Sequence, residues 1–267
     1  MKKKTVGIML SLSMAMSLMA CGSSTQPAAA SVDTEEPAAT TQAASTAEAT
    51  ASSTEAAADT AASTADVTTI KDGTLMVGVE IGYPPMEYFD TDGATPIGFD
   101  VEVANALADY LGLELELVDT SWDGIFAGVD TGKYDCIISC VSITDERKEQ
   151  FNLTKPYVSN HTVLIVPNDS EIDSMEALNG HSTAVQAETT ADDYMKEHSA
   201  ELGAELFQYD KVINCFDDLK AGRTDSVFTD SVVAAYYLGD EASNYKTVWE
   251  NDELEPIGIC LRRGMMV

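Results

Sequence analysis

Residues 75–118 read LMVGVEIGYPPMEYFDTDGATPIGFDVEVANALADYLGLELELV, and this stretch decides the fold. It opens with an apolar run at residues 75–79, which has the length of a strand. After a loop with two prolines, residues 100–111 place apolar side chains at helical spacing, and Gly112 ends that helix. A second short apolar run follows at residues 113–118. Strand, helix and strand in this order predict an α/β fold with a largely parallel sheet.

The alternation continues along the chain and divides into two series. The first series adds a helix at 123–130 and a strand at 134–139, and it predicts one lobe. The second series predicts strands at 162–166, 183–186 and 225–228, with helices at 190–199, 215–221 and after Asp230. A last apolar run, 258–261, lies beyond Trp249, where the chain could cross back to the first lobe. We therefore expect lobe 1 at residues 67–159 plus 255–267, and lobe 2 at 160–254.

The N-terminal residues have the pattern of an export signal. Three lysines precede an apolar stretch, residues 6–19, that is too short to span a bilayer comfortably. Leu18-Met19-Ala20-Cys21 resembles the lipobox at which bacterial lipoproteins are cut and acylated. We expect residues 1–20 to be the signal peptide and Cys21 to carry diacylglycerol and palmitate. A chance cysteine behind an ordinary signal peptide is the alternative.

The segment that follows, residues 22–66, consists almost entirely of Ala, Ser, Thr, Gln, Pro and acidic residues. It contains a single aliphatic residue larger than alanine, Val32, and no aromatic residue. Such a segment cannot bury enough apolar surface to offset its chain entropy, so we expect it to be disordered. Together with Cys21 it predicts a tether that holds the folded part at the extracytoplasmic face of the cell membrane.

Charge and cysteine usage exclude several functional classes. The formal net charge is −30, which is unsuited to nucleic acid because phosphates require a basic surface. Four cysteines follow Cys21, and they lack the paired spacing of a zinc site: Cys136, Cys140, Cys215 and Cys260. We expect them to be small buried hydrophobic residues, and a disulfide between distant cysteines remains open. The sequence predicts no metal, no cofactor and a monomer.

Several motifs occur together in a defined order. They are Gly82-Tyr83-Pro84-Pro85-Met86-Glu87-Tyr88, Gly98-Phe99-Asp100-Val101, Ser121-Trp122-Asp123-Gly124, Gly132-Lys133-Tyr134-Asp135, Ser139-Cys140-Val141-Ser142-Ile143-Thr144-Asp145-Glu146-Arg147 and Leu219-Lys220-Ala221-Gly222-Arg223-Thr224-Asp225. This series resembles the family 3 extracellular solute-binding proteins of polar amino acid ABC importers. The resemblance implies a type II periplasmic-binding-protein-like fold: two lobes, two hinge strands, and a ligand held in the cleft and delivered to the membrane permease.

The chemistry of a free amino acid indicates which residues hold it, because a selective site needs a cation, an anion and a shaped pocket. The place of Arg147 in the matching series implies that it binds the carboxylate, which its planar fork can meet through two parallel charge-assisted hydrogen bonds. The alternative for Arg147 is a surface ion pair with Glu146 or Glu149. The resemblance implies that Asp230 receives the ligand's ammonium. Its alternative role is to cap the helix that follows.

The resemblance implies further contacts in both lobes. Ser139, Cys140 and Ser142 lie where a strand gives way to a helix and backbone N–H groups converge on anions, although Ser142 could instead cap that helix. Thr189 and Thr190 match a turn whose amide and hydroxyl reach the same carboxylate. Glu188 precedes this turn at a position where the family commonly has glycine, so the turn's geometry is open.

Three more positions are expected to contact the ligand's side chain. Tyr83 and Trp122 match the aromatic positions that sandwich it, and their alternative role is core packing. Glu80 matches a position where an acid in some relatives meets a basic side chain. It therefore favours a polar or cationic amino acid.

Other readings of the same chain remain. Family members continue past the strand that matches residues 258–262, whereas this sequence stops at Val267, so we expect the C-terminal helical segment to be missing. A tethered amino-acid sensor would use the same two lobes. A dehydratase related to the cyclohexadienyl dehydratases is the enzymatic alternative, but the chain's three histidines show no spacing for nucleophilic or metal chemistry. We expect a binding protein and not an enzyme.

Overall fold

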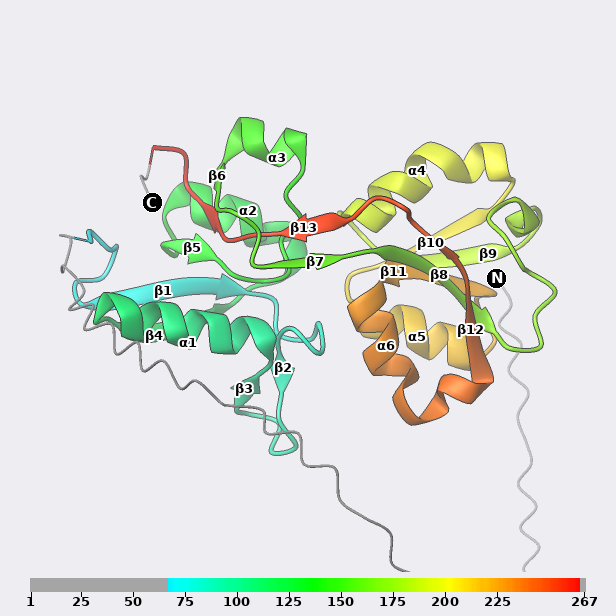
Figure 1. Cartoon of the computed structure of the whole chain (residues 1–267), viewed down its shortest axis with the longest axis horizontal. Coiled ribbons are helices and arrows are strands. Elements are labelled where there is room, and N and C mark those ends of the chain that lie inside the picture. The colour runs from blue at the N-terminus through cyan, green and yellow to red at the C-terminus, as the bar shows by residue number, and fades with distance from the viewer. Residues whose placement is uncertain (1–66, 265–267) are drawn as a thin grey trace, which may run out of the picture. The chain divides into compact units, whose positions relative to one another are not determined.

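The computed structural model describes residues 67–264, which belong to one compact unit of the chain (Figure 1). The predicted signal peptide, the lipidated Cys21 and the tether lie outside the described residues. Two five-stranded sheets, each with helices on both faces, confirm the α/β fold with two lobes. Within residues 67–264, no helix combines the length and the apolar character that crossing a membrane requires.

The first sheet has the strand order β4-β1-β5-β14-β6. Its strands are β1 (Thr74–Val79), β4 (Glu114–Asp119), β5 (Cys136–Ile137), β6 (Asn152–Leu153) and β14 (Cys260–Leu261). β4, β1 and β5 are parallel, whereas β14 runs antiparallel to both β5 and β6. Because β6 pairs antiparallel with β14, it runs parallel to β5. The sheet is therefore largely parallel, as predicted, and only β14 runs in the opposite direction.

Alternation along β1 sends its side chains to two helices on opposite faces of this sheet. Leu75, Val77 and Val79 pack with α1 (Phe99–Leu111), and Met76 packs with the cluster formed by α2 (Trp122–Thr131). Left-handed glycines end both helices, as predicted for the first of them. The sequence did not predict the hairpin of β2 (Tyr88–Phe89) and β3 (Pro96–Ile97), whose strands have only two residues each.

The predicted strand at 134–139 is wrong at both ends, since only Cys136–Ile137 forms β5. The chain turns sharply at Cys140, whose φ of 45° lies in the left-handed region. The backbone N–H of Cys140 donates to Asp100 Oδ2 at 2.6 Å, which holds this turn against the start of α1. A short helix, α3 (Asp145–Gln150), follows.

The second sheet has the order β10-β9-β11-β8-β12. Its strands are β8 (Thr162–Pro167), β9 (Ser182–Gln186), β10 (Glu205–Tyr209), β11 (Ser226–Asp230) and β12 (Tyr245–Glu250). α4 (Thr190–Leu202) covers one face, and α5 (Val212–Lys220) with α6 (Ser231–Leu238) covers the other. Two 3-10 turns, η1 (Glu176–Leu178) and η2 (Gly239–Asn244), complete the lobe. The sequence missed β10 and β12 because these edge strands are only partly buried and lack an apolar run.

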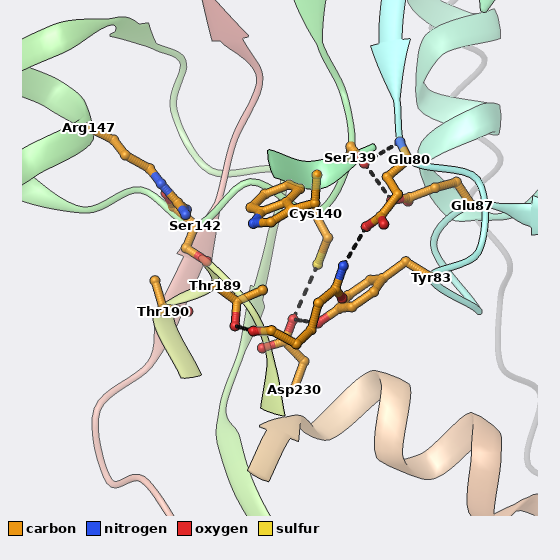
Figure 2. Close-up of a pocket in the computed structure, with 12 residues that line it drawn as sticks. Glu80, Tyr83, Glu87, Ser139, Cys140, Ser142, Arg147, Thr189, Thr190 and Asp230 are labelled. Atoms are coloured by element: carbon orange, nitrogen blue, oxygen red, sulfur yellow. Dashed lines mark hydrogen bonds between the residues drawn. The ribbon is translucent and has the colours of Figure 1, made fainter. Parts of the chain in front are cut away.

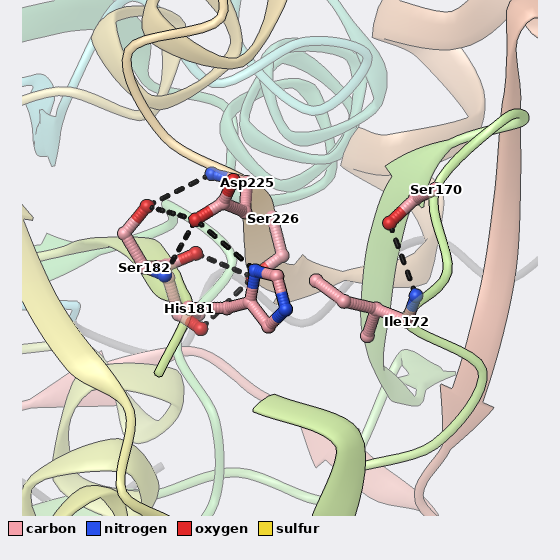
Figure 3. Close-up of polar contacts among 7 residues, drawn as sticks. Ser170, Ile172, His181, Ser182, Asp225 and Ser226 are labelled. Atoms are coloured by element: carbon pink, nitrogen blue, oxygen red, sulfur yellow. Dashed lines mark hydrogen bonds and ion pairs between the residues drawn. The ribbon is translucent and has the colours of Figure 1, made fainter. Parts of the chain in front are cut away.

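The two lobes contain the same local device, a glycine followed three residues later by an aspartate. Asp135, after Gly132, accepts hydrogen bonds from the backbone of Ile70 and Met76, both at 2.8 Å. Asp225, after Gly222, accepts from the backbone N–H and the hydroxyl of Ser182, both at 2.8 Å, and lies 3.6 Å from His181 Nδ1 (Figure 3). Each aspartate ties the start of one strand to the parallel strand beside it, so these two motifs are structural.

Two strands run between the sheets. β7 (Val158–Asn160) and β13 (Glu255–Ile257) pair antiparallel, with Pro256 opposite Ser159. β7 precedes the second sheet, and β13 returns the chain to β14 in the first. These are the two predicted hinge strands. They bring the carboxyl ends of β1, β9 and β11 to one region, where the candidate site lies.

Candidate ligand-binding site

A cavity that comprises about 330 Å³ of space, part of it open to solvent, is lined by side chains from both lobes. All ten of the predicted binding residues line it: Glu80, Tyr83, Trp122, Ser139, Cys140, Ser142, Arg147, Thr189, Thr190 and Asp230. Two further residues, Glu87 and Gln186, were not predicted. In Figure 2, Arg147 lies with Ser142 and Thr190 at one end of the cavity, and Glu80 lies with Glu87 and Ser139 at the other.

Arg147 provides the positive end of the cavity. Its guanidinium lies over the rings of Phe126 and Trp122, with the carbon 4.9 and 5.6 Å from their centroids, and Nη1 donates to the Ser142 carbonyl at 3.0 Å. Burial lowers its pKa from 12.5, but a guanidinium keeps its charge at neutral pH. The side chain is thus held by aromatic faces and does not form the alternative surface ion pair with Glu146 or Glu149. The remaining N–H groups can meet a carboxylate.

Asp230 provides a negative group, and it is nearly fully buried. It stands at the N-cap position of α6, but its carboxylate makes no capping hydrogen bond. Instead, Oδ2 accepts from the Tyr83 hydroxyl at 2.6 Å and lies 3.7 Å from Cys140 Sγ. Burial, together with the charge of Glu255, raises the pKa of Asp230 to about 7. The capping alternative therefore does not describe this side chain, which is oriented toward the cavity.

The segment from Ser139 to Ser142 supports the site through the Ser139 hydroxyl and the Ser142 carbonyl. Ser139 Oγ accepts from the backbone N–H of Glu80 at 3.0 Å and donates to Glu87 Oε1 at 2.6 Å. The Ser142 carbonyl holds Arg147, while Thr144, not Ser142, caps α3 by accepting from the backbone N–H of Arg147. Ser142 is therefore not the cap of the following helix.

The second lobe contributes the N-terminus of α4. Thr189 Oγ1 accepts from the backbone N–H of Asp192 at 3.2 Å and donates to the Gln186 carbonyl at 2.8 Å, so this hydroxyl is already engaged. Thr190 begins the helix, whose positive dipole end faces the cavity and suits a carboxylate. Because the Thr189 hydroxyl is already engaged, Thr189 supports the turn and can offer its backbone, more than its hydroxyl, to a ligand.

The backbone conformation of Glu188 explains why the family commonly has glycine at this position. Its φ is 62°, a left-handed conformation that glycine adopts without strain. Its carbonyl accepts from Trp122 Nε1 at 2.9 Å, which joins the two lobes, and its N–H donates to Asp192 Oδ2 at 2.7 Å. The turn thus keeps the geometry expected of a glycine even though a glutamate occupies it.

The other end of the cavity is acidic. Glu80, Glu87 and Gln186 are each at most 3% exposed, and each has one side-chain oxygen without a hydrogen-bond partner. Burial raises the pKa of Glu80, and burial together with Asp100 raises that of Glu87 well above its usual range. Their signals in the sequence are weak: Glu87 stands within the Gly-Tyr-Pro-Pro motif, and Gln186 is the amide that ends an apolar strand.

The four cysteines of the described residues lie in the interior. Cys136, Cys140, Cys215 and Cys260 are buried and unpaired, as expected for small hydrophobic residues. Residues 67–264 contain no group of three or more His, Cys, Asp or Glu side chains that could hold a metal ion. Burial raises the pKa of the Cys140 thiol well above its usual range, so it is protonated in the cavity.

Known proteins share this fold and about a third of the aligned residues. The L-cystine-binding protein TcyJ of Escherichia coli (strain K12) is 31% identical over 194 residues, covering 72% of each chain. An ancestral arginine-binding protein bound to arginine is 34% identical, with a TM-score of 0.68 over 72% of this chain and 85% of its own. An ancestral amino acid-binding protein, AncCDT-1, described as a precursor of cyclohexadienyl dehydratase, is 36% identical, with a TM-score of 0.66 over 72% and 83%.

The model of one family matches residues 75–214, which is more than half of the chain. Its description is "Bacterial extracellular solute-binding proteins, family 3". The solved structures confirm the two-lobed periplasmic-binding fold, and the relatives named above as binding proteins support a solute-binding role. The chain therefore belongs to the bacterial extracellular solute-binding proteins, family 3.

Proposed function

We propose that this chain is the substrate-binding lipoprotein of an ABC importer, which captures an α-amino acid between its lobes and delivers it to the membrane permease. The observation that carries the proposal is the pair of oppositely charged groups in one cavity, Arg147 from the first lobe and Asp230 from the second. An α-amino acid has the complementary pair, a carboxylate and an ammonium.

The two charged groups have defined roles in this binding. The Arg147 fork and the N-terminus of α4 take the carboxylate, so that both lobes hold the same group. Asp230 takes the ammonium, and the Tyr83 hydroxyl orients its carboxylate from the opposite lobe. Trp122 and Tyr83 supply aromatic faces beside the ligand. A ligand held by groups of both lobes stabilises the closed form, and β7 and β13 are the strands about which closure occurs.

The side chain of the ligand is proposed to be polar or cationic. Glu80 stands at the acidic end of the cavity, where burial raises its pKa and where a positive or N–H-bearing group is favoured. Two of the similar proteins are named for cystine and arginine, amino acids with a charged group at the far end. This agreement supports the polar or cationic class.

The location follows from the first residues of the sequence. The leader, the small residue Ala20 and Cys21 together support export and acylation, and the segment 22–66 supports a tether at the extracytoplasmic face. The family is extracellular by its description. A Cys21→Ala variant is expected to leave the membrane fraction, whereas a Cys215→Ala variant is expected to remain there.

The test of binding is a thermal-shift series on protein stripped of carried-over ligand, with the common amino acids and cystine. A ligand that binds only the folded protein raises the midpoint of unfolding. The shift should be lost in Arg147→Ala and Asp230→Ala and kept in Arg223→Ala, whose guanidinium pairs with Asp218 outside the cavity. A folded protein that no amino acid stabilises would contradict the proposal.

A dehydratase is not proposed, although one of the similar structures is described as a precursor of such an enzyme. His161 lies by Asn251, His181 by Asp225, and His198 against the ring of Tyr194, and none of the three lines the cavity. Turnover of prephenate by the purified protein would overturn this reading.

A further inference from the structure

We propose that Gln186 is a specificity-determining residue: with Glu80 it forms a pair of acceptors, one from each lobe, that selects amino acids whose side chain ends in an N–H-bearing cation. This inference rests on the proposed capture of α-amino acids. It adds the residue that recognises the far end of the ligand's side chain, and it explains how this recognition is coupled to closure of the lobes.

The orientation of the Gln186 amide is set by its neighbours. Nε2 donates to Glu80 Oε2 at 2.8 Å and to the Asp210 carbonyl at 3.2 Å, so both amide hydrogens are used. The oxygen Oε1 is therefore the atom that remains, and it is buried without a partner in the described structure. Gln186 consequently presents an acceptor, not a donor, to the cavity.

Glu80 presents a second acceptor beside the first. Its Oε2 receives the Gln186 amide, while its Oε1 is buried and has no partner among the described residues. Burial raises the pKa of Glu80, and the Gln186 amide and the ammonium of Lys211, which donates to the Ile81 carbonyl at 3.2 Å, act in the opposite direction. A carboxyl oxygen and an amide oxygen, on two side chains joined by a hydrogen bond, are thus left unpartnered at the end of the cavity away from Arg147.

Glu87 also has an unpartnered oxygen, but its neighbourhood explains that atom. Ser139 donates to Glu87 Oε1, and the adjacent Asp100 is held by the backbone of Cys140 and by the hydroxyl of Tyr157. Burial and the negative charge of Asp100 raise the pKa of Glu87 well above its usual range, which favours a protonated Glu87, a weaker acceptor than an ionised carboxylate. The acceptors left for a ligand are those of Glu80 and Gln186.

This pair discriminates between side chains. A guanidinium or ammonium satisfies both oxygens, whereas an aliphatic side chain leaves two buried acceptors unpaired, which lowers affinity roughly 10- to 100-fold. A carboxylate is disfavoured because it offers no donor to these two acceptors. Glu80 follows β1 of the first lobe, and Gln186 ends β9 of the second. A cation can therefore contact both side chains only when the lobes are closed.

The test is calorimetric titration of the full chain, stripped of ligand, with arginine, lysine, citrulline, norleucine and glutamate. The wild type should bind arginine or lysine at least 10-fold more tightly than norleucine and citrulline, and glutamate should bind most weakly. In Gln186→Met, the ratio between arginine and norleucine should fall at least 10-fold. Gln186→Glu keeps an acceptor at this position and should retain the preference for arginine.

Gln208→Met is the matched control, because Gln208 also donates to a carboxylate, that of Asp192 at 2.7 Å, but lies on β10 outside the cavity. Its ratio between arginine and norleucine should equal that of the wild type. An unchanged ratio in Gln186→Met, or a wild type that prefers norleucine or glutamate, overturns the inference while leaving amino-acid capture intact. Absence of binding by every amino acid would instead refute the proposed function itself.

Discussion

The affinity for an α-amino acid is expected to fall as the pH is lowered from 7.5 to 5.5, because Asp230 must be ionised to receive the ammonium. Burial and the charge of Glu255 raise the pKa of Asp230 to about 7. A bound ammonium favours the carboxylate and lowers that pKa. Binding therefore releases protons, and affinity is lost as the pH falls through the pKa of the unliganded protein.

The size of the effect follows from the ionised fraction. With a pKa of about 7, roughly three quarters of Asp230 is ionised at pH 7.5 and roughly 3% at pH 5.5, which corresponds to about 25-fold weaker binding or about 2 kcal/mol. Two neighbours of the carboxylate, Tyr83 and Cys140, have pKa values raised well above their usual range, so they do not titrate in this interval.

The assay is titration calorimetry at several pH values with glutamine, whose neutral side chain removes any contribution from the titration of Glu80. Repeating it in buffers of different ionisation enthalpy counts the protons released. Asp230→Asn should bind weakly at every pH, with a flat profile. Wild-type affinity that changes less than threefold between pH 7.5 and 5.5, with no proton release, would refute the role given to Asp230.

Two further predictions concern the left-handed positions beside the site. Glu188→Gly should raise the free energy of unfolding by about 0.5–1 kcal/mol in urea titrations, because glycine relieves the strain at φ 62° and keeps both backbone hydrogen bonds, whereas Glu188→Ala should give no gain. A destabilised glycine variant would contradict this account. Cys140 should be modified by a small methanethiosulfonate only when the lobes open, so a bound amino acid should slow its modification at least tenfold, as measured by peptide mass mapping. Cys215, buried in the second lobe, should react slowly with or without ligand, and equal rates at Cys140 would argue against closure.

Much of the fold could be predicted from the sequence because the relevant signals are local. Apolar runs of strand length, helical spacing and terminating glycines identified β1, α1, β4 and α4 to within a few residues. The edge strands β10 and β12 were missed because partly exposed strands do not need an apolar run. The hinge strands were expected from the resemblance to the family more than from their own residues.

Most residues that line the candidate site were indicated by the order of the sequence motifs and not by local hydrophobic patterns. The order of the motifs indicated ten residues, and all ten line one cavity. Glu87 and Gln186 escaped because neither stands at a position whose chemistry is evident alone. A glutamate in a proline-rich loop and a glutamine at a strand end are ordinary surface residues until burial shows otherwise.

By itself, then, the sequence determined the α/β alternation, the division into two lobes, the acidic character of the chain and the residue types of the site, because these depend on neighbouring residues and composition. Only the tertiary structure decided what individual side chains do. The amide of Gln186 faces the cavity as an acceptor because partners 106 and 24 residues away take its hydrogens. Asp230 faces Tyr83, 147 residues away, instead of capping its own helix. Such roles depend on contacts between distant segments, which no local pattern records.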